Sequence, residues 1–197
     1  MPEPRVPMLP LQESRKRAAA LGLNPQFAEL SVFRILLHNQ PVAGEIAKTL
    51  TTLLFDGNVL DTRLRELIIM RIGWRTGATY EWTQHWRVAR GLDIPAEDLL
   101  AVRDWQTAKN LTDADKAVLQ ATDDTLDHGH ILADTWDSCC KHIKSEAERV
   151  ELVIAIGNWH LFAQLLKSLE VPLEEGLTPW PPDGLVGGPD GGLAGLG

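Results

Sequence analysis

Residues 63–74, Arg63-Leu-Arg-Glu-Leu-Ile-Ile-Met-Arg-Ile-Gly-Trp74, form a helical pattern whose apolar side chains point in nearly every direction around the axis. A helix of this kind is buried among other helices instead of lying on a surface. Gly77 breaks the pattern, and residues 79–90 then follow an amphipathic helical pattern that ends at Gly91. We therefore predict a central helical hairpin, in which a buried helix packs against an amphipathic partner.

The same helical periodicity extends over the rest of the chain, and no segment shows the alternating pattern of a strand between turn residues. Residues 65–73 and 149–157 share an apolar pattern, which predicts a weak internal pseudo-repeat. The predicted fold class is all-α. Further helices are expected at residues 27–37 (closed by Pro41), 46–54, 95–102, 112–126, 131–143 and 146–169.

Proline and glycine are dense at both ends of the chain and sparse in the middle. Four of the 12 prolines lie within the first ten residues, and residues 184–197 hold seven of the 16 glycines with almost no charge. Such a tail buries too little apolar surface to offset the entropy of ordering it. We expect a Pro-rich arm over residues 1–10, a single all-α domain over 11–180 and a disordered Gly/Pro-rich tail over 181–197.

The chain of 197 residues carries a net charge of −8 and has a pI near 5.2, which argues against nucleic acid or an anionic membrane as its partner. Cys139 and Cys140 are adjacent, so no disulfide framework is expected and a reducing compartment is favoured. The first residues lack the apolar region of a signal peptide, and the longest wholly apolar stretch, residues 152–156, is too short to cross a bilayer. We expect a cytoplasmic protein.

Glu66, Glu81 and His85 form the strongest candidate for a chemical site. Glu81 and His85 are four residues apart and share one side of the second hairpin helix, and the turn at Gly77 folds that helix back toward Glu66. Burial raises the pKa of a carboxylic acid, and an imidazole transfers protons near neutral pH. The pattern predicts a proton-handling site in an apolar wall formed by Ile69, Met70, Trp74 and Trp82.

Structural interpretations of the same residues remain open at this point. A Glu–His pair four apart is often only a surface pair, and Arg63 or Arg71 can neutralise Glu66. His160, beside Trp159, is interpreted as a satisfied core histidine. A further group of acidic and histidine residues lacks recognised ligand spacing, so we interpret it as a solvated loop and predict no metal: Asp123, Asp124, Asp127, His128, His130 and Asp134.

The segments Arg63-Leu-Arg-Glu66-Leu and Gly77-Ala-Thr-Tyr80-Glu81-Trp82-Thr-Gln-His85 resemble the central motif of the carboxymuconolactone decarboxylase family, which includes the AhpD-type alkylhydroperoxidases. The core of this resemblance covers residues 61–95. It implies an AhpD-like helical fold, a homo-oligomer (a trimer or hexamer, with a dimer also possible) and a site near subunit contacts. It also implies that Glu66, Glu81 and His85 occupy the functional positions of the family.

The sequence departs from the peroxidase branch of that family, in which a Cys-x-x-Cys pair begins the helix that carries the histidine. Here these positions are Ala78 and Glu81, so the thiolate that a peroxidase needs is missing. The resemblance then implies a decarboxylase or isomerase that needs no cofactor and acts on a small unsaturated or oxo acid. His85 would protonate the dienolate left by loss of CO₂, while Glu66 and Glu81 hold the proton and restore it.

The expected substrate-binding residues are Tyr80, Trp82, Met70, Trp74 and Arg71. Arginines suit an anionic substrate, but the spacing does not show which of Arg63, Arg71, Arg75, Arg87 and Arg90 faces the site.

Two other functions remain as alternatives. One is a peroxiredoxin-type antioxidant activity that uses Cys139 or Cys140, and the other is a non-catalytic helical oligomer that binds a small apolar ligand between its subunits.

Overall fold

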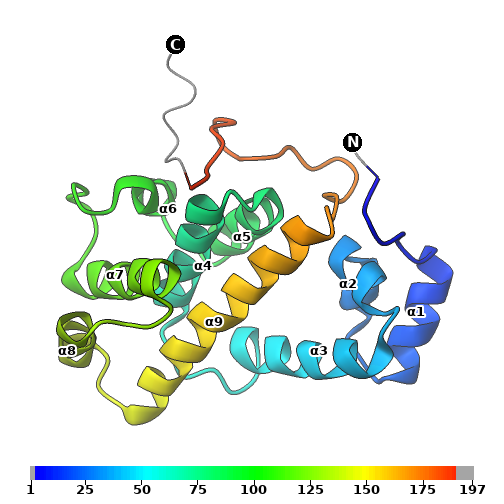
Figure 1. Cartoon of the computed structure of the whole chain (residues 1–197), viewed down its shortest axis with the longest axis horizontal. Coiled ribbons are helices and arrows are strands. Elements are labelled where there is room, and N and C mark those ends of the chain that lie inside the picture. The colour runs from blue at the N-terminus through cyan, green and yellow to red at the C-terminus, as the bar shows by residue number, and fades with distance from the viewer. Residues whose placement is uncertain (1–2, 190–197) are drawn as a thin grey trace. The chain divides into compact units, whose positions relative to one another are not determined.

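The computed structural model describes residues 3–189, and all regular elements within this range are helices (Figure 1). The predicted all-α class is confirmed. The described residues form two compact units: residues 3–58 with 165–177 make unit 1, and residues 59–164 with 178–189 make unit 2. The span 11–180, for which we expect one domain, thus contains parts of both units. None of the described helices has the length and hydropathy required to cross a membrane.

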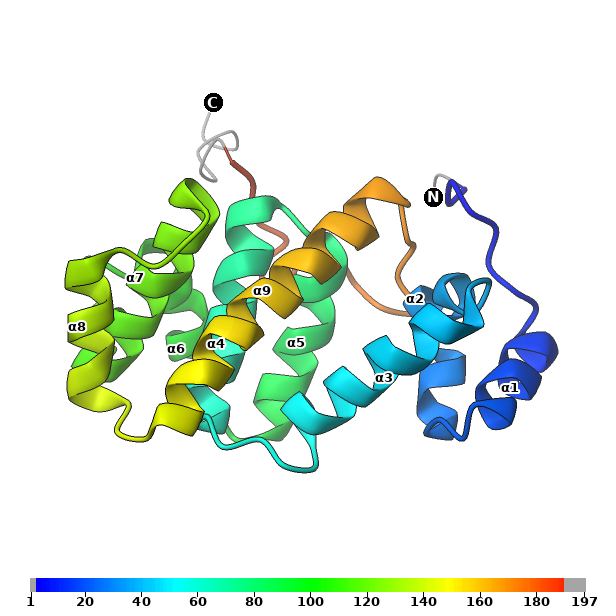
Figure 2. The same ribbon diagram turned by 60° about the horizontal axis from the view of Figure 1, so that its bottom comes forward.

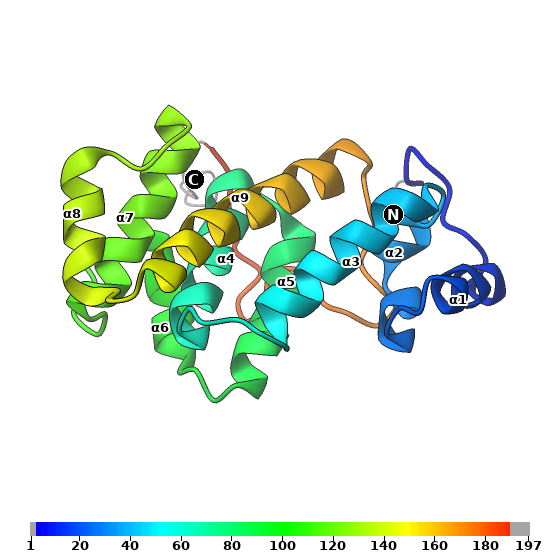
Figure 3. The ribbon, with the colours of Figure 1, turned by 90° about the horizontal axis from the view of Figure 1, so that it is seen from below.

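Unit 1 contains α1 (Leu11–Ala20), the 3₁₀ helix η1 (Pro25–Glu29), α2 (Ser31–Leu36) and α3 (Gln40–Leu54) (Figure 3). The single helix predicted over residues 27–37 is confirmed only from Ser31 to Leu36, because Leu30 has an extended conformation and separates η1 from α2. The role predicted for Pro41 is wrong too: it lies in the first turn of α3, where its missing N–H is not needed. The sequence pattern did not reveal α1, in which only Ser14 and Ala18 are buried.

The helical hairpin of unit 2 is formed by α4 (Thr62–Thr76) and α5 (Thr79–Gly91), as predicted. Every residue from 65 to 74 is buried, so α4 is the central helix of the unit. Gly77 ends α4 with φ 66°, a left-handed conformation that glycine adopts without strain. Gly73 allows the hairpin to close, since a Cβ atom there would lie 3.1 Å from the backbone nitrogen of Trp82.

The other elements of unit 2 are α6 (Ala96–Ala101), the 3₁₀ helix η2 (Val102–Asp104), α7 (Asp113–His128), α8 (Ala133–His142) and most of α9 (Glu146–Ser168). Thr112 begins α7 with a capping box, in which its hydroxyl accepts from the N–H of Asp115 and the Asp115 carboxylate accepts from the N–H of Thr112. In Figure 2, α8 lies beside α7.

Three arginine–aspartate pairs join α4 to α7: Arg63 with Asp115, Arg71 with Asp123 and Arg75 with Asp127. The partners are 52 residues apart in each pair, so the two helices run in the same direction in constant register. The central pair is buried and bidentate, with Arg71 donating from Nε and Nη2 to the two carboxylate oxygens at 2.8 and 2.7 Å. Arg71 also donates to the carbonyl oxygens of Val102 and Arg103.

The described part of the expected C-terminal tail packs on the hairpin of unit 2. Trp180 contacts the rings of Trp74 and Trp82, and the indole nitrogen of Trp82 donates to the carbonyl oxygen of Pro181 at 2.7 Å. Arg103 pairs with Asp183 at 2.7 Å and stacks over the two hairpin indoles. Residues 181–189 therefore make specific contacts. Residues 190–197 of the expected tail and residues 1–2 of the expected arm lie outside the described residues.

Replacing Arg71 tests whether the α4–α7 pairs hold the hairpin in place. Arg71→Met leaves the buried carboxylate of Asp123 without its bidentate partner, so we expect the free energy of unfolding to fall by about 3 kcal/mol. Arg87→Met, at an exposed position on α5, is the matched control and should change it by less than about 0.5 kcal/mol. Urea unfolding followed by circular dichroism measures both, and equal stability of the two variants would contradict the prediction.

Candidate active site

The structure brings Glu66, Glu81 and His85 together inside unit 2. Glu66 projects from α4, and one of its carboxylate oxygens, Oε2, lies 2.8 Å from Nδ1 of His85 on α5. Glu81, one turn before His85 on the same helix, places its Oε2 3.6 Å from Nε2 of that imidazole. The two carboxylates thus face opposite nitrogens of one ring. His85 keeps an 11% exposed side chain, more than Glu66 at 0% and Glu81 at 6%, so access from solvent is greatest at the imidazole.

Arg65 neutralises Glu66. Its Nε and Nη2 both donate to Oε1 of Glu66, at 3.0 and 2.9 Å, in a region where neither side chain is exposed. The sequence interpretation named Arg63 or Arg71 for this role, which is wrong because Arg63 pairs with Asp98 and Asp115 while Arg71 pairs with Asp123. Adjacent residues on a helix do not face each other, so spacing gave no signal for Arg65. Its long side chain bends back to reach the neighbouring carboxylate.

Trp159 is the other member of the site that sequence reasoning missed. Its indole nitrogen donates to Nε2 of His85 at 3.1 Å, and the two rings meet edge to face with centroids 5.8 Å apart. The core position expected for His160 is wrong: His160 is exposed, and Trp159, one residue earlier on α9, is buried in its place. The buried face of α9 repeats with helical spacing, so periodicity could have identified Trp159 as a buried residue. Its buried positions are 152, 155, 156, 159, 162 and 163.

The two carboxylic acids have pKa values displaced in opposite directions. Burial alone raises the pKa of Glu66, but the charge and hydrogen bond of His85, together with Arg65, outweigh burial and hold the pKa below its ordinary value. Burial raises the pKa of Glu81 to about 7; the charge of His85 opposes this rise and that of Glu66 adds to it. Glu66 is therefore ionised at neutral pH, whereas the pKa of Glu81 lies near neutrality.

Glu81 has a buried oxygen without a hydrogen-bond partner, Oε2, and this is the atom that faces His85. Burial lowers the pKa of His85, but the charge and hydrogen bond of Glu66 and the charge of Glu81 raise it above the ordinary value. The indole N–H of Trp159 can only donate, so in this geometry Nε2 accepts and the imidazole proton lies on Nδ1, toward Glu66. Oε2 of Glu81 and Nε2 of His85, 3.6 Å apart, are therefore neighbouring positions that can each take up a proton.

The five residues expected to bind substrate lie in the interior of unit 2. Met70, Trp74 and Trp82 belong to the hydrophobic cluster that includes Trp180, and Tyr80 is buried as well. Arg71 follows Glu66 by five residues, which is about 140° around a helix, and its guanidinium binds Asp123 on α7. The assignment of these residues to substrate binding stays a prediction.

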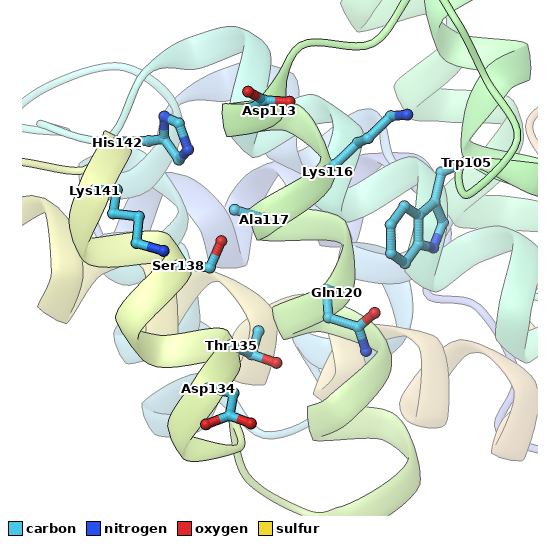
Figure 4. Close-up of a pocket in the computed structure, with 10 residues that line it drawn as sticks. All are labelled: Trp105, Asp113, Lys116, Ala117, Gln120, Asp134, Thr135, Ser138, Lys141 and His142. Atoms are coloured by element: carbon cyan, nitrogen blue, oxygen red, sulfur yellow. The ribbon is translucent and has the colours of Figure 1, made fainter.

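A separate pocket of about 590 Å³ lies between α7 and α8, lined by Trp105, Lys116, Ser138 and Lys141 among others (Figure 4). Two of the residues considered for a metal have other partners, since Asp123 pairs with Arg71 and Asp124 accepts from the N–H of Leu132. Within residues 3–189, no three His, Cys, Asp or Glu side chains are placed to hold a metal ion together.

Residues 41–124 match the model of the carboxymuconolactone decarboxylase family. This part of the chain is similar to that family. The matched segment includes all of α4 and α5, and hence Arg65, Glu66, Glu81 and His85, but it ends before α9. Trp159 therefore comes from outside the family match. No curated protein matches the sequence.

Solved structures with the same fold are AhpD-like. A peroxidase-related protein from Ralstonia eutropha JMP134, described as an alkylhydroperoxidase AhpD core, has a TM-score of 0.71 over 89% of this chain and 94% of its own at 14% identity. A peroxidase-related protein from Silicibacter sp. TM1040 has a TM-score of 0.64 over 92% and 96% at 13% identity. The debrominase Bmp8, as a Cys-to-Ala variant in complex with 2,3,4-tribromopyrrole, has a TM-score of 0.62 over 84% and 86% at 17% identity. At these identities the likeness shows the AhpD-like fold alone.

The raised pKa of Glu81 predicts how the stability of the protein depends on pH. Between the ordinary value of 4.5 and about 7, the folded protein holds a proton on Glu81 that the unfolded chain releases. This contribution, about 3 kcal/mol, is complete below pH 4.5 and is lost as the pH rises through 7. Glu81→Gln keeps the size of the side chain without its charge, so we expect it to be more stable than the wild type at pH 8 and similar to it at pH 4.5.

Chemical unfolding of both proteins across this pH range measures the difference. Glu146→Gln, at an exposed position at the start of α9, is the matched control and should follow the wild-type profile. If the profile of Glu81→Gln runs parallel to that of the wild type, Glu81 does not hold its proton as we predict.

Proposed function

We propose that this protein is an enzyme that moves protons with Glu66, Glu81 and His85 and needs no cofactor. Its proposed substrate is a small unsaturated or oxo acid, which it decarboxylates or isomerises. The observation that carries the proposal is the unpartnered Oε2 of Glu81, buried 3.6 Å from Nε2 of His85 while Glu66 holds Nδ1. A buried polar atom without a partner costs free energy, so an oxygen of this kind that faces a titratable ring supports a role in proton transfer.

The arrangement supports a specific order of proton movements. In a decarboxylation, the bond to the carboxylate carbon breaks, CO₂ leaves, and the electron pair remains on the substrate as a dienolate. His85 delivers a proton from Nε2 to the carbanionic carbon, and the Glu66 carboxylate stabilises the imidazolium form before this step. Glu81, with a pKa of about 7, then returns a proton to Nε2 and regains one from solvent. In an isomerisation, Nε2 removes a proton from one carbon and returns it to another, with no net change.

Trp159 and Arg65 take part in the proposed reaction by affecting the protonation of His85 and the charge of Glu66. The indole N–H of Trp159 stabilises the neutral imidazole with its lone pair on Nε2, which is the form that removes a proton in an isomerisation and the form left after proton delivery in a decarboxylation. Arg65 balances the charge of Glu66, so the site carries a single mobile proton instead of two. Both side chains are buried, which keeps water from competing for these hydrogen bonds.

The expectations on partners and place in the cell belong to the same proposal. We propose a cytoplasmic homo-oligomer that acts on a small molecule, without a nucleic-acid or membrane partner. The acidic composition of the chain supports this choice of partners. The pseudo-repeat of residues 65–73 and 149–157 stays a prediction.

Replacing His85 tests the proposed chemistry. We expect His85→Ala to lower turnover at least about 100-fold, since an acid–base group of this kind contributes 10²–10⁴ to the rate. The assay presents a panel of small unsaturated and 2-oxo acids in D₂O and follows CO₂ release and deuterium incorporation at carbon by mass spectrometry. His130→Ala, at an exposed position after α7, is the control and should retain full activity. If the wild type turns over a substrate of the panel and His85→Ala turns it over at the same rate, the proposal is contradicted.

A thiol peroxidase is the competing function, favoured by the AhpD-like description of the structural relatives. The only two cysteines of the chain are poorly suited to it: Cys139 is buried, its thiol donates to the carbonyl oxygen of Ala117, and burial raises its pKa to about 11. A thiol with such a pKa forms almost no thiolate at neutral pH. Cys140 is half-buried beside it.

We therefore expect the double variant Cys139→Ser/Cys140→Ser to consume an alkyl hydroperoxide no more slowly than the wild type. Peroxide loss is followed in the presence of a dithiol reductant, and the single variant Cys140→Ser separates the half-buried thiol from the buried one. Rapid consumption by the wild type that disappears in the double variant would replace our proposal with the peroxidase function.

A further inference from the structure

One face of α9 presents apolar side chains to solvent. Val150, Val153, Ile154 and Leu161 are 64%, 48%, 50% and 48% exposed, and their spacing of three, four and seven residues places them on one side of the helix. The opposite side of α9 is buried and carries Trp159, so the helix is apolar on both sides. Figure 2 shows the length of this helix, in yellow and orange. A single exposed apolar residue is ordinary, but a continuous stripe marks a contact surface.

Gly157 lies in the middle of this stripe, and no contact with the described residues 3–189 accounts for it. A Cβ atom added at Gly157 would meet no atom within 4 Å, whereas one added at Gly73 would meet the backbone of Trp82 at 3.1 Å. Glycine inside a helix costs about 1 kcal/mol relative to alanine. At Gly73 the close contact of α4 with α5 compensates for this cost. No such contact is found at Gly157 among the described residues, and the surface of a second copy could supply one.

The arrangement of side chains around Gly157 fits a second copy of the same helix. A twofold axis through Gly157 that runs two α9 helices antiparallel places Val153 opposite Leu161 of the other copy, and Gly157 opposite itself. The first turn of α9 is acidic, with Glu146 and Glu148, and its last turn is basic, with Lys167. Antiparallel packing brings the acidic start of one helix toward the basic end of the other, and it also opposes the two helix dipoles.

We propose that two copies of this chain associate through antiparallel packing of their α9 helices, which cross at Gly157. The missing side chain lets the helix axes approach closely, and the valine, isoleucine and leucine side chains on either side pack across the twofold axis. The contact buries the exposed stripe of α9 while its other face continues to hold Trp159 against His85. This association is independent of the proposed chemistry, so either can fail without the other.

A bulky side chain at the crossing point is the direct test. Light scattering after size-exclusion chromatography gives the mass of the wild type, which we expect to be an even multiple of 21.8 kDa at micromolar concentration. Gly157→Arg should halve that mass and leave the circular dichroism unchanged, because the monomer has space at this position. Gly91→Arg, at the end of α5 and also without an atom within 4 Å, is the matched control and should keep the wild-type mass.

A second pair of variants does not depend on the glycine. Leu161→Lys should weaken the association at least tenfold, while Leu132→Lys, another exposed leucine outside α9, should not. A wild type that is monomeric at 100-fold higher concentration, or an assembly whose mass neither Gly157→Arg nor Leu161→Lys reduces, overturns the proposal. If the wild type is monomeric, the exposed stripe of α9 is instead a contact surface for another protein.

Disulfide formation tests the antiparallel direction. In a Cys140→Ser background, whose remaining thiol is buried, Val153→Cys is mixed with Leu161→Cys and mildly oxidised. We expect the mixed dimer to form, and Val153→Cys alone to remain uncrosslinked, because its two copies lie about 12 Å apart along the helices. Crosslinking of Val153→Cys with itself as fast as in the mixture indicates parallel helices and contradicts the proposed geometry.

Discussion

The arrangement of unit 2 depends on a carboxylate that has no contact with solvent. Glu66 lies on the most buried helix of the unit, and it can keep its charge there only because Arg65 and His85 each bind one of its oxygens. The hydrogen bond to His85 fixes how α5 faces α4, and Trp159 of α9 then fixes the other side of the imidazole. Three helices are thus tied together through one ionised group.

Apolar packing alone would not hold α4 in a single position. The helix is apolar nearly all round, so sliding or turning it would still bury much the same surface. The three arginine–aspartate pairs to α7 remove this freedom, because each requires one register, and Arg71 additionally binds the carbonyl oxygens that follow α6. The same pairs explain why arginines that look suited to an anionic substrate are engaged elsewhere. Charge on α4 serves mainly to position the helix, and Glu66 on the same helix also binds Nδ1 of His85, the residue to which we assign the proposed proton transfer.

Much of unit 2 could be predicted from the sequence, whereas the start of unit 1 could not. The hairpin, the break at Gly77 and the capping of α7 by Thr112 follow from strong local signals, and the structure has all of them. The segment around Leu30 was predicted wrongly because its apolar spacing suits a helix, although the chain turns there between η1 and α2. At Pro41 the local rule allows two outcomes, since proline can follow one helix or begin the next. Asn39, which caps α3, decides for the second.

Periodicity and spacing within about 20 residues are enough to predict the helical class, the hairpin and the presence of Glu66, Glu81 and His85 on its two helices. They do not show which cation neutralises Glu66, which residue of α9 reaches His85, or which oxygen of Glu81 is left without a partner. Side-chain direction and long-range packing set these contacts. Trp159 lies 74 residues from His85 in the chain, and no spacing rule extends over such a distance.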